Sequence, residues 1–524
     1  MPVARTRAVA LIGLAGSVVE VEADLASQLP GLVIIGLPDA ALGEARERVR
    51  SAASNAGCPL PQRRLTVNLS PASLPKHGSG FDLAIALACL AAAGMVDPAS
   101  VDRMVHLGEL GLDGRVRPIA GVLPAVLAAS RAGHRTVMVP EANAEEAALV
   151  PGVEVIAVGS LIEAAIRHGG SFDPETAEAF RERAARERDV EADASPPPAP
   201  VAPAGDLADV TGNTDAVQAL LAAAAGGHHV FLGGPPGAGK TMLASRLPGI
   251  LPDLDADAAL EVASLRSLAG EAPHGGLDLR PPFVAPHHTA SAAAIVGGGS
   301  RGIRPGAAPR ASHGVLFLDE APEFAASVLD VLRQPLEAGV ISIHRANAVA
   351  TFPARFQLVL AANPCPCGQH GLKNSDCTCP PVVRRRYLAR LSGPLMDRID
   401  VHLWVPRITA QELRMAGERP SLTSAEAKRR VSAAREAAAE RLRGTPWRTN
   451  AEVPGPWLRG AGGLHPGNRA CVSLDRALER GTVTMRGYDR VLKVAWSLAD
   501  LDGVAIPDAD HVGHALALRK GMQP

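Results

Sequence analysis

The chain has 524 residues, a length that exceeds what one hydrophobic core serves and favours two to four domains. Hydrophobic residues make up 47% and charged residues 20%, as in ordinary globular proteins, and a formal net charge of −1 excludes a global field that would attract DNA or acidic lipid. Because aromatic residues are only 3%, a base-stacking platform for single strands is also excluded.

The first part of the chain, residues 1–172, is predicted to be a mixed α/β domain, because short strand-like runs such as "RLTVNLS" alternate with alanine-rich helical stretches. Its start resembles a secretory signal, but Gly13 and Gly16 interrupt the apolar run and a strand-like alternation continues. The apolar run 84–96 is too short to span a bilayer. We therefore expect a cytoplasmic protein without membrane contact.

Residues 173–205 are predicted to form a linker, since a charged segment is followed by proline and alanine with few bulky apolar side chains. A second α/β unit is expected over 206–406. The remainder, 407–524, is predicted to be a small helical domain. Within it, the mixed charges of 426–443 at helical spacing predict a solvated helix face.

The segment "GPPGAGKT" fits the phosphate-loop pattern G-x-x-x-x-G-K-[ST], between a strand-like run, "HHVFLG", and a helical one, "TMLASRL". The backbone N–H groups of such a loop and the N-terminus of the helix bind phosphate oxygens. Lys240 is expected to neutralise the β/γ oxygens and Thr241 to bind Mg²⁺, so ATP with Mg²⁺ is the predicted cofactor. The predicted nucleotide-binding residues are Gly234, Pro235, Pro236, Gly237, Ala238, Gly239, Lys240, Thr241 and Asp319.

Two further apolar runs carry polar side chains at their ends. The run "GVLFLDEAPEF" delivers Asp319 and Glu320 at the carboxyl end of a predicted strand, where open α/β sheets bind their ligands. Asp319 is expected to hold Mg²⁺ through water, and Glu320 to polarise the attacking water. The run "RFQLVLAANP" ends in Asn363, whose amide either orients that water or only forms an Asn-Pro turn.

Insertions lie between these strands. The glycine-rich segment "PHHTASAAAIVGGGSRGIRPG" is predicted to project as a loop, and "GVISIHRANAVATFPARF" to form a hairpin. Arg301 and Arg304 follow the glycines of the first insertion, and Arg345 lies in the second. His287 and His288 are either additional metal ligands or loop contacts. Projecting elements on a phosphate-hydrolysing core suit a motor that grips its load.

Seven cysteines occur, four of them with the spacing C-x-C-x₉-C-x-C directly after Asn363. This clustering favours a metal site in a reducing compartment over a disulfide framework. Four thiolates can close a tetrahedral Zn²⁺ site, and free thiols are the alternative. The isolated Cys58, Cys89 and Cys471 are expected only to be packed. The predicted ligands are Cys365, Cys367, Cys377 and Cys379.

Together these stretches resemble the helix-2-insert branch of AAA+ ATPases and, more closely, the Mg-chelatase-like YifB/ComM family. The resemblance covers nearly all of the chain except the linker. It implies a P-loop AAA+ core with a helix-2 insert, a small α-helical C-terminal lid, and a homo-hexameric ring whose ATP sites lie between subunits. It is carried by "PHHTAS", "GVLFLDEAPEF", "LRQPLEAGVISIHRA", "PARFQLVLAANPCPCG", "LSGPLMDRIDVHLWVP" and "RGYDRVLKVAWSLADL".

The resemblance also implies roles for two arginines. Arg398 in "LMDRID" would be the finger that completes a neighbour's site, and Arg486 in "TMRGYDR" would be the lid arginine that senses nucleotide. A surface or ion-pair arginine is the alternative for each. Two positions depart from the family: Ala307 stands where many relatives carry glutamate, and Trp496 where arginine is frequent. The predicted catalytic residues are Glu320, Asn363, Arg398 and Arg486.

The first domain resembles the Lon protease domain, an S5 domain 2-like fold, in "NLSPASLPKHGSGFDLAIALACL". A Lon-type enzyme needs a serine activated by a lysine. Here the nucleophile position falls on Gly80, with Ser79 one place early, and the position of the lysine falls on Ala125 or a neighbour. Lys76 precedes Ser79 but does not match the catalytic lysine. We therefore expect a non-proteolytic module that docks or guides a substrate.

Three loads are compatible with such a motor. The family resemblance implies DNA, acted on by a helicase that drives branch migration of recombination intermediates in natural transformation or DNA repair, through sequence-independent phosphate contacts. One alternative is a metal-chelatase motor that works on a porphyrin partner. The other is a protein-remodelling or regulatory ATPase, which the first domain could serve.

Overall fold

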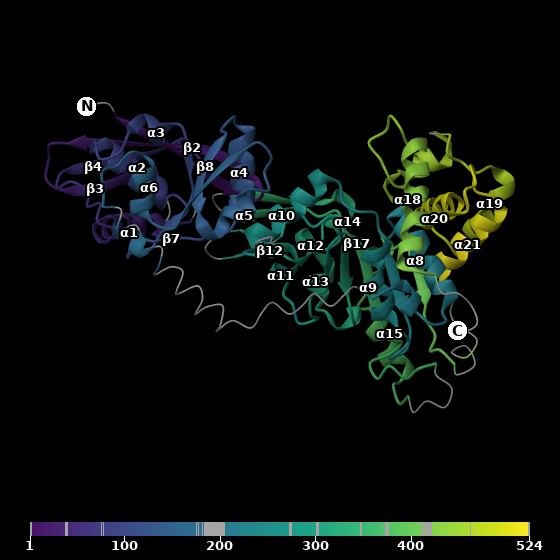
Figure 1. The fold of residues 1–524 in the computed structure, drawn as a ribbon. Helices are drawn as coiled ribbons and strands as arrows, with labels where there is room; N and C mark the ends of the chain where they lie inside the picture. Colours follow the sequence, from purple (N-terminus) through teal and green to yellow (C-terminus); the bar gives the residue numbers. More distant parts are fainter. Residues whose placement is uncertain are drawn as a thin grey trace.

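The computed structural model describes residues 3–36, 40–74, 76, 78–173, 175–176, 178–180, 182, 205–271, 275–299, 303–345, 348–371, 377–409, 414, 422–461 and 463–521. Most of the linker predicted over 173–205 lies outside the described residues, as does Arg301, but the described residues 175–176, 178–180 and 182 are helical, and Phe180 packs against the core of the first domain. Figure 1 shows an elongated molecule in which a front unit (residues 4–167), a P-loop unit (207–404) and a helical unit (424–520) follow one another.

The front unit is built on one mixed sheet. Within the described residues, seven strands pair in the order β3-β4-β2-β1-β5-β8-β9, and β2 is antiparallel to both β1 and β4. The strands are β1 (Ala4–Ile12), β2 (Ala15–Ala26), β3 (Gly31–Ile35), β4 (Arg64–Ser70), β5 (Val105–His106), β8 (Thr136–Pro140) and β9 (Glu154–Val158), with a separate pair of β6 (Glu109–Leu110) and β7 (Val116–Arg117). The helices are α1 (Ala40–Asn55), α2 (Asp82–Ala92), α3 (Pro98–Asp102), α4 (Val122–Arg131), α5 (Ala144–Ala147) and α6 (Leu161–Arg167).

The apolar run that was too short for a membrane forms a core helix. Every side chain of α2, "DLAIALACLAA", is buried among the strands and helices of the front unit. None of the described helices in the protein is both long and apolar enough to cross a membrane.

The P-loop unit contains a parallel sheet that determines where the site lies. Among the described residues, five strands pair in the order β11-β14-β17-β10-β18. They are β11 (Phe283–Val284), β14 (Val315–Leu318), β17 (Gln357–Ala362), β10 (Val230–Gly233) and β18 (Val401–Trp404). Gly233 pairs with Ala362, and Leu318 with Leu360. Because parallel strands end at one edge, the residues that follow β10, β14 and β17 emerge side by side.

Helices and short elements surround this sheet. They are η2 (Leu207–Asp209), α8 (Thr214–Gly226), α9 (Lys240–Ile250), α10 (Ala256–Ala269), α11 (Ala292–Val296), α12 (Ala307–Arg310), η3 (Ala321–Glu323), α13 (Ala326–Asp330), α14 (Pro335–Ala338), α15 (Pro381–Leu388) and α16 (Gly393–Met396).

Two hairpins occur where the sequence predicts insertions. The pairs are β12 (Gly297–Gly298) with β13 (Arg304–Pro305), and β15 (Val340–Arg345) with β16 (Ala348–Pro353), both antiparallel. They lie side by side, since a Cβ atom on Gly297 would come within 3.0 Å of Ile343 Cδ1. The tip of the second hairpin, residues 346–347, and the side chain of Arg345 lie outside the described part of the chain.

The helical unit packs directly on the P-loop unit. Its elements are α18 (Ser424–Arg441), η4 (Asn450–Glu452), η5 (Trp457–Ala461), α19 (Asn468–Glu479), α20 (Met485–Asp502) and α21 (Ala509–Lys520). Side chains of α18 to α21 share one hydrophobic core with α8, α9 and β10. The solvated face predicted over 426–443 therefore covers only part of α18, whose buried stripe is Ala427, Val431, Ala434 and Ala438.

The front unit contacts the P-loop unit through α10 and the second hairpin. Leu265 of α10 is buried together with Ala350 and Phe352 of β16. Ile12 and Leu14, at the turn between β1 and β2, pack against this cluster. In Figure 1, α4 and α5 of the front unit accordingly lie beside α10.

Candidate nucleotide site

The predicted phosphate loop joins the end of β10 to the start of α9, with Lys240 as the first helical residue. Gly237 and Gly239 have φ values of 75° and 90°, in the left-handed region that favours glycine. Gly234 is required for a different reason, because a Cβ atom there would lie 2.3 Å from the carbonyl oxygen of Val405. The loop can therefore bend tightly, and the first N–H groups of α9 face it, as in anion-binding loops.

Lys240 is buried at the centre of this loop and is 7% exposed. Its Nζ donates hydrogen bonds to the carbonyl oxygens of Gly234 at 2.7 Å and Pro235 at 3.0 Å, and to Oδ1 of Asn363 at 3.1 Å. Burial lowers the pKa of Lys240, and Asp319 and Glu320 oppose that shift. The ammonium group is thus held in place by oxygens that a phosphate can replace.

Asp319 and Glu320 follow β14 and point to different partners. Thr241 donates its hydroxyl proton to Asp319 Oδ2 at 2.8 Å. Hydroxyl and carboxylate oxygens this close fit the ligand preference of Mg²⁺, so Thr241 and Asp319 are able to hold the ion. The Glu320 carboxylate is half exposed, and its Oε2 lies 3.6 Å from Nδ1 of His288.

Asn363 reaches the loop because β17 lies beside β10 in the sheet. Its amide oxygen accepts a hydrogen bond from Lys240, so Asn363 contacts the phosphate loop. His287 and His288, for which metal binding was one reading, stack on one another with ring centroids 4.1 Å apart. His288 faces Glu320, a contact that sequence spacing gave no signal for.

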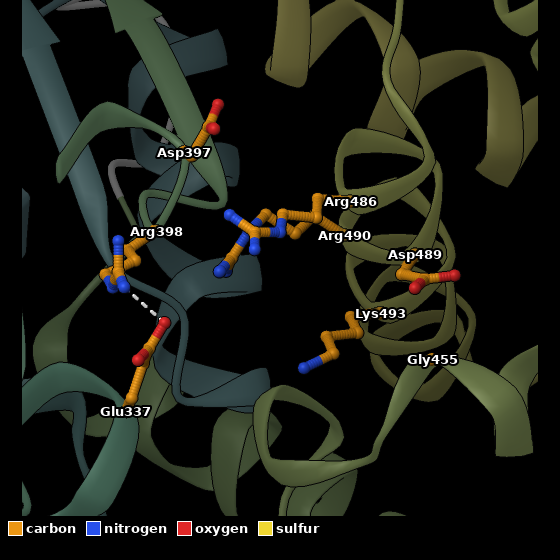
Figure 2. A pocket seen from close by; sticks show the side chains of 8 residues that line it. All are labelled: Glu337, Asp397, Arg398, Gly455, Arg486, Asp489, Arg490 and Lys493. Atoms are coloured by element: carbon orange, nitrogen blue, oxygen red, sulfur yellow. Dashed lines mark hydrogen bonds and ion pairs between the residues drawn. The ribbon is translucent and has the colours of Figure 1, made fainter. Parts of the chain in front are cut away.

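The predicted finger, Arg398, and the predicted lid arginine, Arg486, line a different pocket, of about 210 Å³. Figure 2 shows Arg486 and Arg490 of α20 pointing toward the segment that carries Arg398. The Arg398 side chain is 13% exposed and forms an ion pair with Glu337. Arg486 is exposed and has no hydrogen bond or ion pair within the described residues.

Glu337, Arg490 and Lys493 are among the residues of this pocket that the sequence did not predict. Glu337 precedes the second hairpin, and its spacing from Arg398 gave no hint of the ion pair. Arg490 and Lys493 follow Arg486 by four and seven residues on α20, and no role was predicted for them from the sequence. The helical periodicity of α20 places all three cations on one side of the helix, which was the available signal.

The four clustered cysteines converge after β17. Their sulfur atoms all lie within 4.8 Å of one another, and among the described residues neither His287 nor His288 joins the group. Cys365 is buried and Cys367 is exposed. This cluster could bind a metal ion.

The two departures from the family pattern are accommodated by packing. Ala307 is 2% exposed at the start of α12. Trp496 is 4% exposed and donates its indole N–H to the carbonyl of Leu464 at 2.9 Å. The Arg441 guanidinium lies 4.2 Å from the centroid of its ring, so a cation–π contact occupies this position.

The residues that matched the Lon pattern do not form a serine–lysine pair. The Lys76 side chain is buried, and its Nζ donates to the carbonyl oxygens of Pro71 at 2.6 Å and Leu74 at 3.2 Å. Ser79 donates instead to the carboxylate of Glu109. Ala125 is buried within α4.

Comparison with known proteins gives the family. The family described as "Magnesium chelatase, subunit ChlI" matches residues 206–413, and two related descriptions, "Subunit ChlI of Mg-chelatase" and "Magnesium chelatase, subunit ChlI C-terminal", match 21–143 and 421–519. An uncharacterized protein of Mycobacterium tuberculosis is 49% identical over 99% of both chains. Competence protein ComM of Haemophilus influenzae is 39% identical, and uncharacterized protein YifB of Escherichia coli 38%, each over 97% of this chain and 96% of the relative.

These matches define a class of Mg-chelatase-like AAA+ ATPases, in keeping with the mixed α/β fold and the phosphate loop. The chain belongs to the YifB/ComM family within that class. A shorter stretch is similar to Lon protease of Roseiflexus castenholzii, at 36% identity over 85 residues, or 16% of this chain and 10% of that protein.

Proposed function

We propose that the protein is an ATP-driven hexameric ring motor of the cytoplasm that acts on DNA, as a helicase that drives branch migration of recombination intermediates. The observation that carries the proposal is the separation of the two arginines from the phosphate loop of their own chain. Phosphoryl transfer needs a cation at the developing charge, and such an arginine can come from a second molecule.

The contacts of the two arginines support a head-to-tail assembly. Within the described residues, the hydrogen bonds of Arg398 go to Glu337 and to the carbonyl of Pro394, and none reaches the phosphate loop. Arg486 points into the same pocket (Figure 2). A neighbouring copy that lays this pocket over the loop of Lys240 would supply both cations at once. Repeating that contact around an axis closes a ring when the rotation between neighbours is one sixth of a turn.

In this proposal each residue of the nucleotide site has a defined role. Lys240 holds the β- and γ-phosphate oxygens, while Thr241 and Asp319 hold the magnesium ion. Magnesium, when bound, neutralises charge on the phosphates. Glu320 accepts a hydrogen bond from the attacking water and aligns it, and Asn363 orients the same water beside Lys240.

The two hairpins support DNA as the load. They lie side by side, and Arg304 is exposed on the first while Arg345 stands next to the tip of the second. Because the net charge is only −1, DNA contact requires such local cations, which a six-fold ring would repeat around its opening. One relative carries the name competence protein ComM.

The front unit is proposed to be non-proteolytic, since Ser79 contacts a carboxylate and Lys76 is enclosed by carbonyls. We further assign the cysteine cluster to one structural Zn²⁺ ion, which tetrathiolate sites bind in a reducing compartment.

The decisive test is ATP turnover and strand exchange on synthetic three- and four-way junctions, with ATP and with a non-hydrolysable analogue. Forked DNA should stimulate turnover, and junctions should be converted only with ATP. Arg345→Ala should weaken DNA binding while basal turnover is kept, whereas Arg443→Ala, which removes an exposed charge two residues after the end of α18, should leave both unchanged. Stimulation by a protein or a porphyrin partner, with no response to any DNA, would favour the remodelling or chelatase alternatives.

A further inference from the structure

The cysteine cluster has the geometry of a metal site rather than of disulfides. The sulfur atom of Cys365 lies 3.3 Å from that of Cys367 and 3.8 Å from that of Cys377, and the last two are 3.7 Å apart. A disulfide would need about 2.05 Å. Four sulfurs at 2.3 Å from a tetrahedral Zn²⁺ lie about 3.8 Å from each other, which matches two of the three distances closely.

The segment Cys365–Gly368, called the cysteine arm below, packs against the phosphate loop. Gly368 turns in the left-handed region, with φ of 74°, and its N–H donates to the carbonyl of Cys365 at 2.9 Å. A Cβ atom on Gly368 would lie 2.4 Å from Cγ of Pro236, the third residue of the loop. On its carbonyl side, Pro236 accepts a hydrogen bond from Arg407 Nε at 3.0 Å. The loop is therefore held between the cysteine arm and Arg407.

The cysteine arm also begins next to Asn363, on the side of the nucleotide site formed by β17. Cys365 follows Asn363 by two residues, and Asn363 contacts Lys240. Arg384 of α15 contacts the ring of His370, which lies between the second and third cysteines. One ion at the cluster would thus fix the end of β17, the outer side of the phosphate loop and the start of α15 relative to one another.

We propose that metal bound by the four cysteines positions the phosphate loop through Gly368, so that metal occupancy sets the affinity for ATP. Gly368 acts as a positioning residue, because it touches Pro236 and not the nucleotide. Without the ion, only thiol contacts close the arm, Pro236 loses a packed wall, and the loop must be ordered when nucleotide binds. The effect on ATP rests on the proposed nucleotide site, whereas the metal site itself does not.

The first experiment measures metal content and ATP affinity separately. Protein purified under reducing conditions should contain one zinc per chain by elemental analysis. Cys379→Ala should lose the zinc and weaken binding of a fluorescent ATP analogue about tenfold, while Cys471→Ala, at a buried cysteine outside the cluster, should change neither. Zinc-free protein with full ATP affinity would overturn the proposal, whatever its activity on DNA.

The second experiment separates positioning from folding. Gly368→Ala should keep its zinc and melt close to the equally strained control below, but raise KM for ATP about tenfold with little change in kcat, because the new Cβ displaces Pro236. Gly371→Ala is the matched control, since its φ of 83° carries the same backbone strain and its Cβ would meet nothing within 4 Å. Equal KM values in the two variants would remove Gly368 from this role, and a failure of DNA stimulation alone would not affect it.

Discussion

Glu320 combines a strained backbone with a half-exposed carboxylate. Its φ of 49° lies in the left-handed region, which costs a residue with a side chain on the order of 1 kcal/mol or more. The backbone N–H of Glu320 donates to Asp319 Oδ1 at 2.9 Å. This turn directs two consecutive carboxylates to different partners, Asp319 to Thr241 and Glu320 to the side of His288.

That division of roles predicts different defects for two substitutions. Glu320→Gln should bind ATP with unchanged affinity and hydrolyse it at least about a hundredfold more slowly, because the amide cannot take up the water's proton. Lys240→Ala should instead lose binding, since the buried cation is removed. Nucleotide titrations and phosphate-release assays distinguish the two, and normal turnover in either variant would contradict the site assignment.

Buried histidines predict a loss of stability in mild acid. In the front unit, His106 Nε2 lies 2.9 Å from His168 Nε2, and His106 also contacts Thr6. Burial lowers the pKa of His168 to about 4 and that of His106 well below its usual value. Unfolded histidines bind protons near pH 6.5, so the unfolded state takes up more protons between about pH 6.5 and 4.

The free energy of unfolding should therefore fall as the pH drops through this window, by up to about 1.4 kcal/mol per pH unit for each such histidine. Urea unfolding at pH 7, 6 and 5 measures the slope. His168→Gln should flatten it, and an unchanged slope in that variant would show that other groups dominate.

At the scale of elements, a buried polar network joins α20 to the P-loop sheet. Asp400, just before β18, is 2% exposed and accepts hydrogen bonds from Arg490 and from His228, the latter at 3.0 Å. The other ring nitrogen of His228 lies 2.8 Å from Ser497 Oγ. Burial alone would raise the pKa of Asp400. Arg490 and His228 nevertheless hold this pKa well below its usual value. The network fixes α20, and so Arg486, relative to the segment of Arg398.

Removing the charge of Asp400 should be costly for that reason. Asp400→Asn leaves Arg490 without its buried partner and should lower the free energy of unfolding by about 3 kcal/mol. Glu440→Gln, which breaks an exposed ion pair with Arg443, should change it by less than about 1 kcal/mol. Chemical denaturation of both variants compares the values directly, and similar small changes would show that the network adds little.

Local patterns account for the elements that could be predicted and for those that could not. The strand, loop and helix around Lys240 are specified within 21 residues, Val230 to Ile250, by glycine positions and apolar runs. The ends of the neighbouring strands then bring Asp319 and Asn363 to the same edge of the sheet. The pairs Glu337–Arg398 and His228–Asp400 join distant segments, so only tertiary packing reveals them. The buried stripe of α18 could not be predicted from the sequence, because alanines between charged residues give a weak apolar signal.

At the scale of the whole molecule, the front unit is attached to the part of the motor proposed to contact DNA. Glu146 of α5 accepts hydrogen bonds from the backbone N–H of Leu123 at 2.9 Å and from the hydroxyl of Ser267 on α10. Next to it, the turn at Gly13 meets β16, since a Cβ on Gly13 would lie 2.9 Å from the carbonyl of Thr351. Motion of the second hairpin must therefore be followed by the front unit or break this contact.

Placing a second carboxylate in that interface should separate the units. Ser267→Asp brings a negative charge against Glu146 where both side chains are buried, so the front unit should dissociate from α10. Hydrogen exchange of β16 and of α10 should accelerate, while Ser245→Asp, on α9 outside the interface, should leave both protected. Unchanged protection in Ser267→Asp would mean that the apolar cluster around Phe352 holds the units together by itself.

The proposed ring predicts that two inactive variants restore each other. Lys240→Ala lacks a working loop but keeps Arg398, and Arg398→Ala lacks the finger but keeps its loop. In a head-to-tail ring each site takes the loop from one copy and the finger from the next, so an equal random mixture has about one quarter of its sites intact. Phosphate release should rise from near zero in each variant to at most about a quarter of the unmodified rate. A mixture that stays inactive, although differently tagged copies of the two variants co-purify in one ring, would place Arg398 outside its neighbour's site.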